Sequence, residues 1–203
     1  MTSANQIRDP RTDSLLTPQN AALLIIDYQP IQVSSIASRD KRGLIANVVA
    51  LARTAKLFGL PVILSTVNVK TNINKPTIHQ LTDVLSDVEP IDRTSINAWE
   101  DEDFVRAVRA TGRRKLIIAA LWTEVCLVFP ALDALREGYE VYPVIDAVGG
   151  TSAEAHDIGV KRLMQAGAQP TTWVQVICEL QRDWNRAQTA PGFADVLLSV
   201  VGA

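Results

Sequence analysis

The stretch KLIIAALWTEVC, residues 115–126, joins a short apolar run to the start of a helical pattern. Residues 115–120 are apolar after the first lysine, as in a strand that is covered on both faces of a parallel sheet. Residues 131–138, ALDALREG, place apolar side chains at helical spacing and end in glycine. A buried strand that runs directly into a helix is the repeating unit of α/β proteins, so this stretch predicts that fold class.

The same alternation of strand and helix continues along the chain on both sides of this stretch. Short β-rich runs lie at residues 21–27, 61–67, 115–120 and 140–146, with weaker candidates at 88–92 and 169–174. Helical spacing of apolar residues occurs at 44–59, 102–112, 131–138 and 155–167. We therefore predict a single domain with a doubly wound, mostly parallel sheet and helices on both faces, a Rossmann-like arrangement of three layers.

The length of 203 residues suits one compact domain. Residues 1–18 are polar, contain two prolines and show no periodicity, which predicts an N-terminal arm that packs on the domain (residues 19–203) or on a neighbouring subunit. The C-terminal segment 193–202 is apolar and needs a surface to pack against, as does the N-terminal arm, so we expect a homo-oligomer.

The charge and cysteine content exclude several classes of protein. With 20 basic and 22 acidic residues, the net charge is -2, which does not favour nucleic acid or an anionic membrane as a partner. The most apolar window, residues 116–135, is interrupted by polar residues and a proline, so we do not expect a membrane span. Two cysteines are too few for a disulfide framework, and the first residues lack the apolar core of a signal peptide, which indicates a cytoplasmic protein.

Ligands of open α/β sheets bind beyond the carboxyl ends of the strands, and Cys126 follows such an end. Thr123 is placed to cap the helix that begins there, and the amides of a helix N-terminus favour thiolate. Cys126 is therefore a candidate nucleophile with a pKa below about 8.5, or else an ordinary core cysteine. Pro130 cannot donate a helical hydrogen bond to the Cys126 carbonyl, so the helix should loosen beside the sulfur.

Two charged residues close other predicted strands. Asp27 ends the first strand, where a carboxylate can cap a loop, bind a cation or act as a base. Arg93 ends the third strand, where it can hold a carboxylate as its anion or form a surface salt bridge. The second cysteine, Cys178, has apolar neighbours at helical spacing and is predicted to be a core residue.

The remaining candidate groups predict no further chemistry. His79 and His156 are far apart in sequence and match no metal-ligand spacing, so we expect no metal and no cofactor. Gly149 and Gly150 precede a helix, but they form neither a G-x-G-x-x-G motif nor a Walker-type loop. This favours a plain loop.

Three features together resemble the isochorismatase-like (cysteine hydrolase) superfamily: Asp27 after the first strand, Arg93 before INAW, and TEVC at the start of a helix. Residues 123–147 are similar to that superfamily's nucleophile segment and the strand after it. Three further segments resemble the YcaC-type branch of that superfamily: RTSINAWEDEDFVRAV, RLMQAGAQPTTW and CELQRDW. The resemblance extends from about Leu16 to Trp184.

The resemblance implies a triad of Asp27, Arg93 and Cys126, with an oxyanion hole made by the backbone amides of Trp122 and Cys126. It also implies a cis peptide between Leu121 and Trp122. The amidase relatives commonly carry lysine where Arg93 stands. Because arginine does not readily release its proton, Arg93 should act only through its charge and hydrogen bonds.

The same resemblance narrows the expected reaction. The nicotinamidase branch binds metal through residues after its first strand that are absent from 27–35 and 65–74, and true isochorismatases lack the cysteine. What remains is a hydrolase that cleaves an amide-type C–N bond of a small molecule through an acyl-enzyme on Cys126. Candidates for lining its pocket are Asn97, Trp99, Trp122 and Phe129. The alternatives are redox or thioester chemistry at the same thiol, and a non-catalytic oligomeric binding module on this fold.

Overall fold

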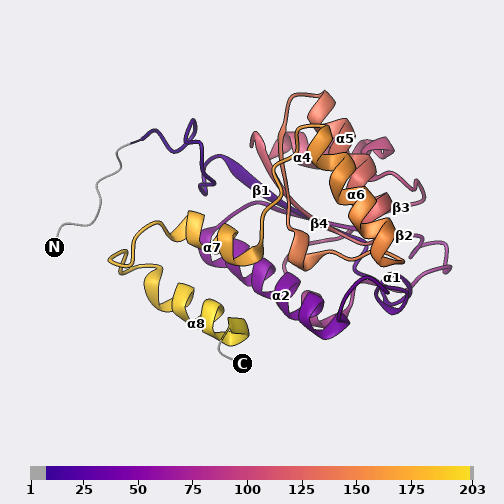
Figure 1. Cartoon of the computed structure of the whole chain (residues 1–203), viewed down its shortest axis with the longest axis horizontal. Helices are drawn as coiled ribbons and strands as arrows, with labels where there is room; N and C mark the ends of the chain where they lie inside the picture. Colours follow the sequence, from indigo (N-terminus) through magenta and orange to yellow (C-terminus); the bar gives the residue numbers. More distant parts are fainter. Residues whose placement is uncertain (1–7, 202–203) are drawn as a thin grey trace.

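A computed structural model describes residues 8–201, which contain a five-stranded sheet with the order β3-β2-β1-β4-β5 (Figure 1). The strands are β1 Ala21–Ile26, β2 Val62–Val67, β3 Ile91–Arg93, β4 Lys115–Ala120 and β5 Glu140–Pro143. Every pair of neighbouring strands is parallel. The predicted doubly wound α/β fold is confirmed, with a sheet that is parallel throughout.

Helices cover both faces of this sheet. The longer ones are α2 Lys41–Phe58, α4 Glu102–Ala110, α5 Val128–Arg136, α6 Ala153–Gln165, α7 Trp173–Gln181 and α8 Ala190–Val201, and the short ones are α1 Pro30–Ser34 and α3 His79–Thr82. Helices α2, α7 and α8 contact one another on one face, and α4, α5 and α6 lie on the other (Figure 1). No helix within residues 8–201 is both long and apolar enough to cross a bilayer.

Two predicted strands differ from the observed ones. The candidate at 169–174 is wrong: Thr171 forms only an isolated bridge to Val144, and Thr172 already caps helix α7 through its hydroxyl. The candidate at 88–92 is confirmed as the short strand β3, which starts only after Pro90. Proline lacks the N–H that a ladder needs, which explains the late start of this strand.

The centre of the core is the pair β1 and β4, in which every residue is buried. Their continuous apolar sequences follow from the helices that cover both faces. The first residue of β4, Lys115, donates from Nζ to the Ser14 carbonyl (2.6 Å) and the Tyr142 hydroxyl (3.0 Å), so its charge is satisfied at the strand's amino end. Part of the segment 8–18 also packs on the domain, since Leu16 is fully buried and its N–H donates to Glu179 (2.7 Å); residues 1–7 lie outside the described part.

The strand order places a topological switch point between β1 and β4. The chain proceeds from β1 to β2 and β3 on one side, and from β4 to β5 on the other. Ile26 pairs with Ala120 in the register of the two strands, and the Leu121 N–H donates to the Ile26 carbonyl (3.1 Å). The residues after β1 and β4 therefore emerge side by side at the carboxyl edge, where ligands of such sheets bind.

The buried centre of β1 gives a stability prediction. Leu24→Ala should lower the free energy of unfolding by about 2–5 kcal/mol, because it leaves a cavity where both faces are packed. Urea denaturation measures this, with Met164→Ala on the exposed side of α6 as a control that should change stability by less than about 0.5 kcal/mol. Equal effects of the two substitutions would contradict the packing described for β1.

Candidate active site

An ion pair between Asp27 and Arg93 lies at the carboxyl edge, with both side chains fully buried. Arg93 donates from Nη1 to Oδ1 and from Nη2 to Oδ2 of Asp27, each at 2.7 Å, so the contact is bidentate. Nη1 also donates to the Ser65 hydroxyl and the Thr66 carbonyl, both at 3.1 Å, and Nη2 donates to the Ile96 carbonyl at 3.3 Å. Burial alone would lower the pKa of Arg93, but the hydrogen bonds and charge of Asp27 raise it, so the guanidinium stays charged.

The loop after β1 gives Asp27 its position. Asp27 has a φ of 61°, a left-handed conformation that aspartate tolerates better than most residues, and its carbonyl accepts from the Gln29 N–H (2.8 Å). The buried Gln29 side chain donates to the carbonyls of Val67 and Lys75 and accepts from the Val67 N–H. The loops that follow β1 and β2 are thereby fixed to each other.

Cys126 lies in a π-helical turn, Thr123–Leu127, that connects β4 to α5. The Leu127 N–H donates to the Trp122 carbonyl (3.2 Å), and the Val128 N–H reaches the Thr123 carbonyl, so both bonds span five residues. The predicted loosening of the helix beside the sulfur is confirmed in the form of this wider turn. Cys126 is 7% exposed, and the Asp27 carboxylate is near enough to act on the pKa of its thiol.

The predicted capping by Thr123 is wrong. The N-cap of the turn is Trp122, and no side chain caps it. Thr123 is fully buried, and its hydroxyl lies 2.8 Å from Nδ1 of His156 on helix α6. The hydroxyl therefore contacts a neighbouring helix and not the amides of its own turn.

The predicted low pKa of Cys126 is also wrong. Burial, followed by the charge and hydrogen bond of Asp27, raises the pKa of Cys126 well above its ordinary value. The charge of Arg93 and the backbone of Trp122 lower it by less. Because Arg93 is already paired with Asp27, the sulfur faces a carboxylate, and the resting state is a neutral thiol beside a base.

Of the predicted pocket residues, Trp122 is the N-cap of the turn that holds Cys126, and its backbone acts on the pKa of the thiol. The peptide bond between Leu121 and Trp122 is cis, as the resemblance implied. The half-buried indole donates from Nε1 to the Gln32 carbonyl (3.2 Å) and the Ser35 hydroxyl (2.8 Å), so its ring is fixed against α1. Phe129 is half-buried and packs against the core.

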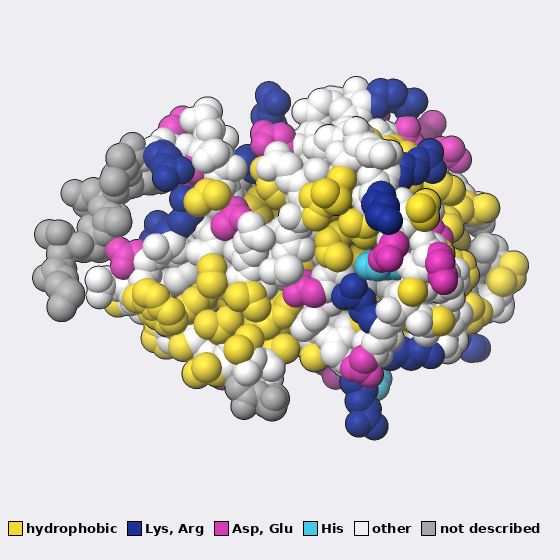
Figure 2. All heavy atoms as spheres, in the orientation of Figure 1, with side chains coloured by type: hydrophobic (Ala, Val, Ile, Leu, Met, Phe, Trp, Pro, Cys, Tyr) yellow, Lys and Arg dark blue, Asp and Glu magenta, His cyan; other side chains and the backbone are white. Residues whose placement is uncertain are grey.

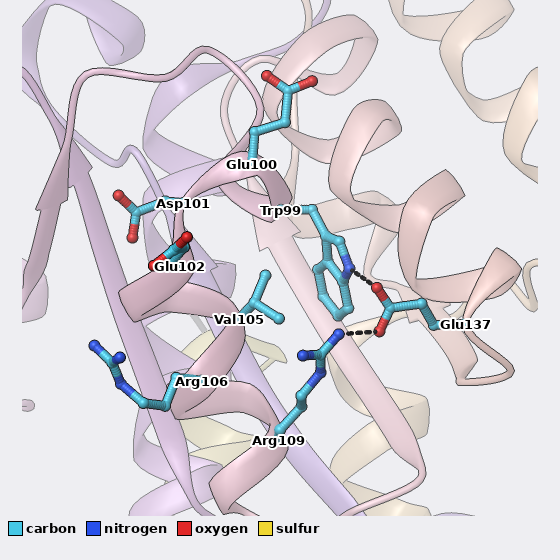
Figure 3. A pocket seen from close by; sticks show the side chains of 8 residues that line it. All are labelled: Trp99, Glu100, Asp101, Glu102, Val105, Arg106, Arg109 and Glu137. Atoms are coloured by element: carbon cyan, nitrogen blue, oxygen red, sulfur yellow. Dashed lines mark hydrogen bonds and ion pairs between the residues drawn. The ribbon is translucent and has the colours of Figure 1, made fainter.

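Asn97 and Trp99 have structural contacts of their own. Asn97 caps the 3₁₀ turn Ala98–Glu100 by accepting from the Trp99 N–H (3.0 Å), and it donates to Asp133 on α5 (2.7 Å). Trp99 donates from Nε1 to Glu137 (2.9 Å) and borders an open surface pocket of about 520 Å³ beside α4 (Figure 3). No residue of the Asp27, Arg93 and Cys126 cluster lines that pocket, and contact of Asn97 or Trp99 with a substrate stays a prediction.

The prediction that Cys178 is a core residue is wrong. It is exposed on α7, whose buried face carries Trp173, Val176, Ile177 and Leu180. Position 178 is one residue beyond Ile177, and a rotation of about 100° per residue turns it away from that face. Apolar neighbours in the sequence therefore do not predict that the Cys178 side chain points into the core.

The sequence did not predict several residues of the site. Ser65 and Gln29 hold the loops, and His156 contacts the cysteine turn, but none belongs to a recognisable motif. Two buried side-chain atoms of residues 93–95, Nε of Arg93 and Oγ of Ser95, have no hydrogen-bond partner. Among residues 8–201, no three or more His, Cys, Asp or Glu side chains are grouped so that they could hold a metal ion.

The sequence is similar to known proteins of one family. A model of the isochorismatase domain family matches residues 21–175. The probable hydrolase YcaC of Escherichia coli is 44% identical over 170 residues, which are 83% of this chain and 81% of that protein.

Two solved structures are similar over nearly the whole chain. YcaC from Pseudomonas aeruginosa, described with hexane-2,5-diol and covalent acrylamide, is 37% identical with a TM-score of 0.82, over 93% of this chain and 98% of that one. YcaC from Escherichia coli, described as an octameric hydrolase of unknown specificity, is 38% identical with a TM-score of 0.82, over 92% and 96%. This chain therefore belongs to the isochorismatase-like hydrolase superfamily, in its YcaC-type branch.

Proposed function

We propose that this protein is a cysteine-dependent hydrolase that cleaves an amide-type C–N bond of a small molecule through an acyl-enzyme on Cys126. The arrangement that carries this proposal is the Cys126 thiol near the Asp27 carboxylate, which raises the pKa of the thiol and is itself held by two hydrogen bonds from Arg93. A nucleophile, a base within hydrogen-bonding reach and a third group that orients the base form the arrangement that acyl transfer needs.

The first half of the reaction transfers the acyl group to sulfur. Asp27 takes the thiol proton as Sγ attacks the carbonyl carbon, and the C=O π electrons move to oxygen to give a tetrahedral oxyanion. The backbone N–H groups of Trp122 and Cys126 would stabilise that oxyanion. Asp27 then gives the proton to the leaving nitrogen, the C–N bond breaks, and an amine and a thioester result.

The second half regenerates the enzyme. Asp27 takes a proton from water as the water oxygen attacks the thioester carbon, and the C–S bond breaks to release the carboxylic acid. The proton returns to the sulfur of Cys126. Arg93 remains protonated throughout, since its charge only orients Asp27 and balances negative charge on the sulfur.

The raised pKa of Cys126 favours this mechanism over redox chemistry. Susceptibility of a cysteine to peroxide follows its thiolate character, and a neutral buried thiol has little. Attack with simultaneous proton transfer to Asp27 needs no standing thiolate. YcaC of Pseudomonas aeruginosa is described with covalent acrylamide, an electrophile that needs a nucleophile on that protein, which is in keeping with a nucleophilic residue in this branch.

Hydrolysis of a panel of small amides, nitriles and carbamates tests the proposal. We expect turnover by the wild type, and a loss of at least about 10³-fold in kcat/KM for Cys126→Ala and for Asp27→Asn, because each removes a group that moves in the first step. Cys178→Ser is the matched control, since this exposed thiol lies on α7, and it should leave the rate unchanged. Turnover that survives Cys126→Ala, or that requires added zinc or iron after chelation, would sink the proposal.

Arg93 gives a second prediction, on stability and rate together. Arg93→Met leaves the buried carboxylate of Asp27 unpaired, so it should lower the free energy of unfolding by about 3–5 kcal/mol. We also expect this variant to lose nearly all activity. Arg93→Lys keeps the charge and loses the bidentate contact, so we expect activity within about 10–100-fold of wild type. Urea denaturation and kcat/KM on the best substrate of the panel measure both, and equal behaviour of the two variants would contradict the assigned role.

We also propose that the chain assembles as a homo-oligomer. Apolar side chains gather over α8 at the lower left of Figure 2, and Trp184, Leu198 and Val201 are 63–70% exposed. Patches of this kind on a soluble domain commonly mark interfaces. YcaC of Escherichia coli, described as octameric, supports the same expectation.

Light scattering on a sizing column should therefore give a mass above the 22.2 kDa of one chain. Leu198→Glu with Val201→Glu should reduce that mass, because the two charges would be buried in the interface. Ile158→Glu, 63% exposed on α6, is the matched control and should leave the mass unchanged. A wild-type monomer at micromolar concentration would contradict the proposal.

A further inference from the structure

His156 contacts the turn that carries Cys126, although it belongs to neither the triad nor a metal site. It lies in the first turn of α6 and is 7% exposed. Its Nδ1 is 2.8 Å from the Thr123 hydroxyl, and its Nε2 is 3.2 Å from Nη2 of Arg39. A buried histidine with a partner on each nitrogen is fixed in both position and orientation.

The contact with Arg39 decides which nitrogen carries the proton. A guanidinium can only donate, so Nε2 of His156 accepts, and Nδ1–H donates to the Thr123 hydroxyl. Burial, followed by the positive charge of Arg39, lowers the pKa of His156, while Asp157 and Glu124 oppose this weakly. The ring is therefore neutral at physiological pH, with its N–H directed at the cysteine turn.

The loop before α6 and the helix itself pack closely on the same turn. The Thr123 N–H donates to the Gly149 carbonyl (2.9 Å), and Glu124 accepts from the N–H (3.0 Å) and the hydroxyl (2.7 Å) of Thr151. A Cβ added at Gly159 would lie 3.2 Å from the Thr123 methyl group. The first two residues of the turn are thus held from outside by backbone, side-chain and packing contacts.

We propose that His156 is a positioning residue that, through Thr123, holds the π turn so that the sulfur of Cys126 stays against the Asp27 carboxylate. A π turn is rare and occurs mostly as a single turn, and contacts from α6 and the loop before it hold the first residues of this one. Cys126 lies three residues after Thr123 within that turn, and a shift of about 1 Å at a reacting atom costs up to about 100-fold in rate. This role rests on Cys126 being the nucleophile of the proposed function.

The test measures the contact between Cys126 and Asp27 by alkylation, without a substrate. Asp27→Asn removes the negative charge that faces the sulfur and leaves the charge of Arg93 beside it, which favours thiolate. We expect iodoacetamide at pH 7.5 to label Cys126 at least about 10-fold faster in Asp27→Asn, which corresponds to one pKa unit. Peptide mass analysis reports each cysteine separately, and the exposed Cys178 of the same chain is the internal reference.

The effect of Asp27→Asn on the labelling rate of Cys126 is then measured in three variant backgrounds. In His156→Leu, the acceleration by Asp27→Asn should fall below about 3-fold, because the sulfur no longer stays beside residue 27. Thr123→Val, which removes only the hydroxyl, should give the same loss. His156→Asn should keep the acceleration, because its amide nitrogen can stand where Nδ1 stood and still donate to Thr123.

Thermal melting shows whether each variant is folded, and Thr123→Val carries the test where His156→Leu does not fold. An undiminished acceleration in folded His156→Leu or Thr123→Val would overturn the positioning role. So would the absence of any acceleration by Asp27→Asn in the wild-type background, since the sulfur would then not face the carboxylate. The predicted pattern combined with a substrate panel that fails would support the positioning role and refute the proposed hydrolysis.

Discussion

The buried ion pair of Asp27 and Arg93 is the constraint on which the rest of the site depends. Both side chains are fully removed from water, which costs several kcal/mol per ion unless geometry and hydrogen bonds compensate. The bidentate contact, the Ser65 hydroxyl and the backbone carbonyls of Thr66 and Ile96 provide that compensation. The carboxyl ends of β1, β2 and β3 are thereby joined around one pair of charges.

The fourth strand adds the sulfur to this arrangement. Since β4 lies beside β1 at the switch point, the turn after β4 emerges next to Asp27, and the thiol comes near enough for Asp27 to raise its pKa. Burial raises the pKa of Cys126 most. The charge of Asp27 raises it further, and the charge of Arg93, which is already paired with Asp27, lowers it by less.

The sequence predicts well whatever depends on the order of the strands. Continuous apolar runs predict the parallel sheet, and parallel strands bring the residues that close them, Asp27, Arg93 and Cys126, to one edge. The ionisation of Cys126 and the partner of Thr123 were predicted wrongly, because they depend on distances between side chains from different elements. Sequence spacing reports which element a residue belongs to, but not which charge lies nearest to it.

The placement of the charges has a consequence for reactivity. An apolar pair of similar volume would often stabilise a fold more than a buried ion pair, so stability gives little reason for Asp27 and Arg93 to be there. Burial and the charge of Asp27 keep the neighbouring thiol of Cys126 protonated, and a protonated thiol reacts slowly with oxidants and adventitious electrophiles. Only an electrophile bound against both Cys126 and Asp27 meets the sulfur and its base together. The ion pair would thus make reactivity conditional on binding, and the geometry of the cysteine turn, including its contacts with α6, would set how strictly that condition applies.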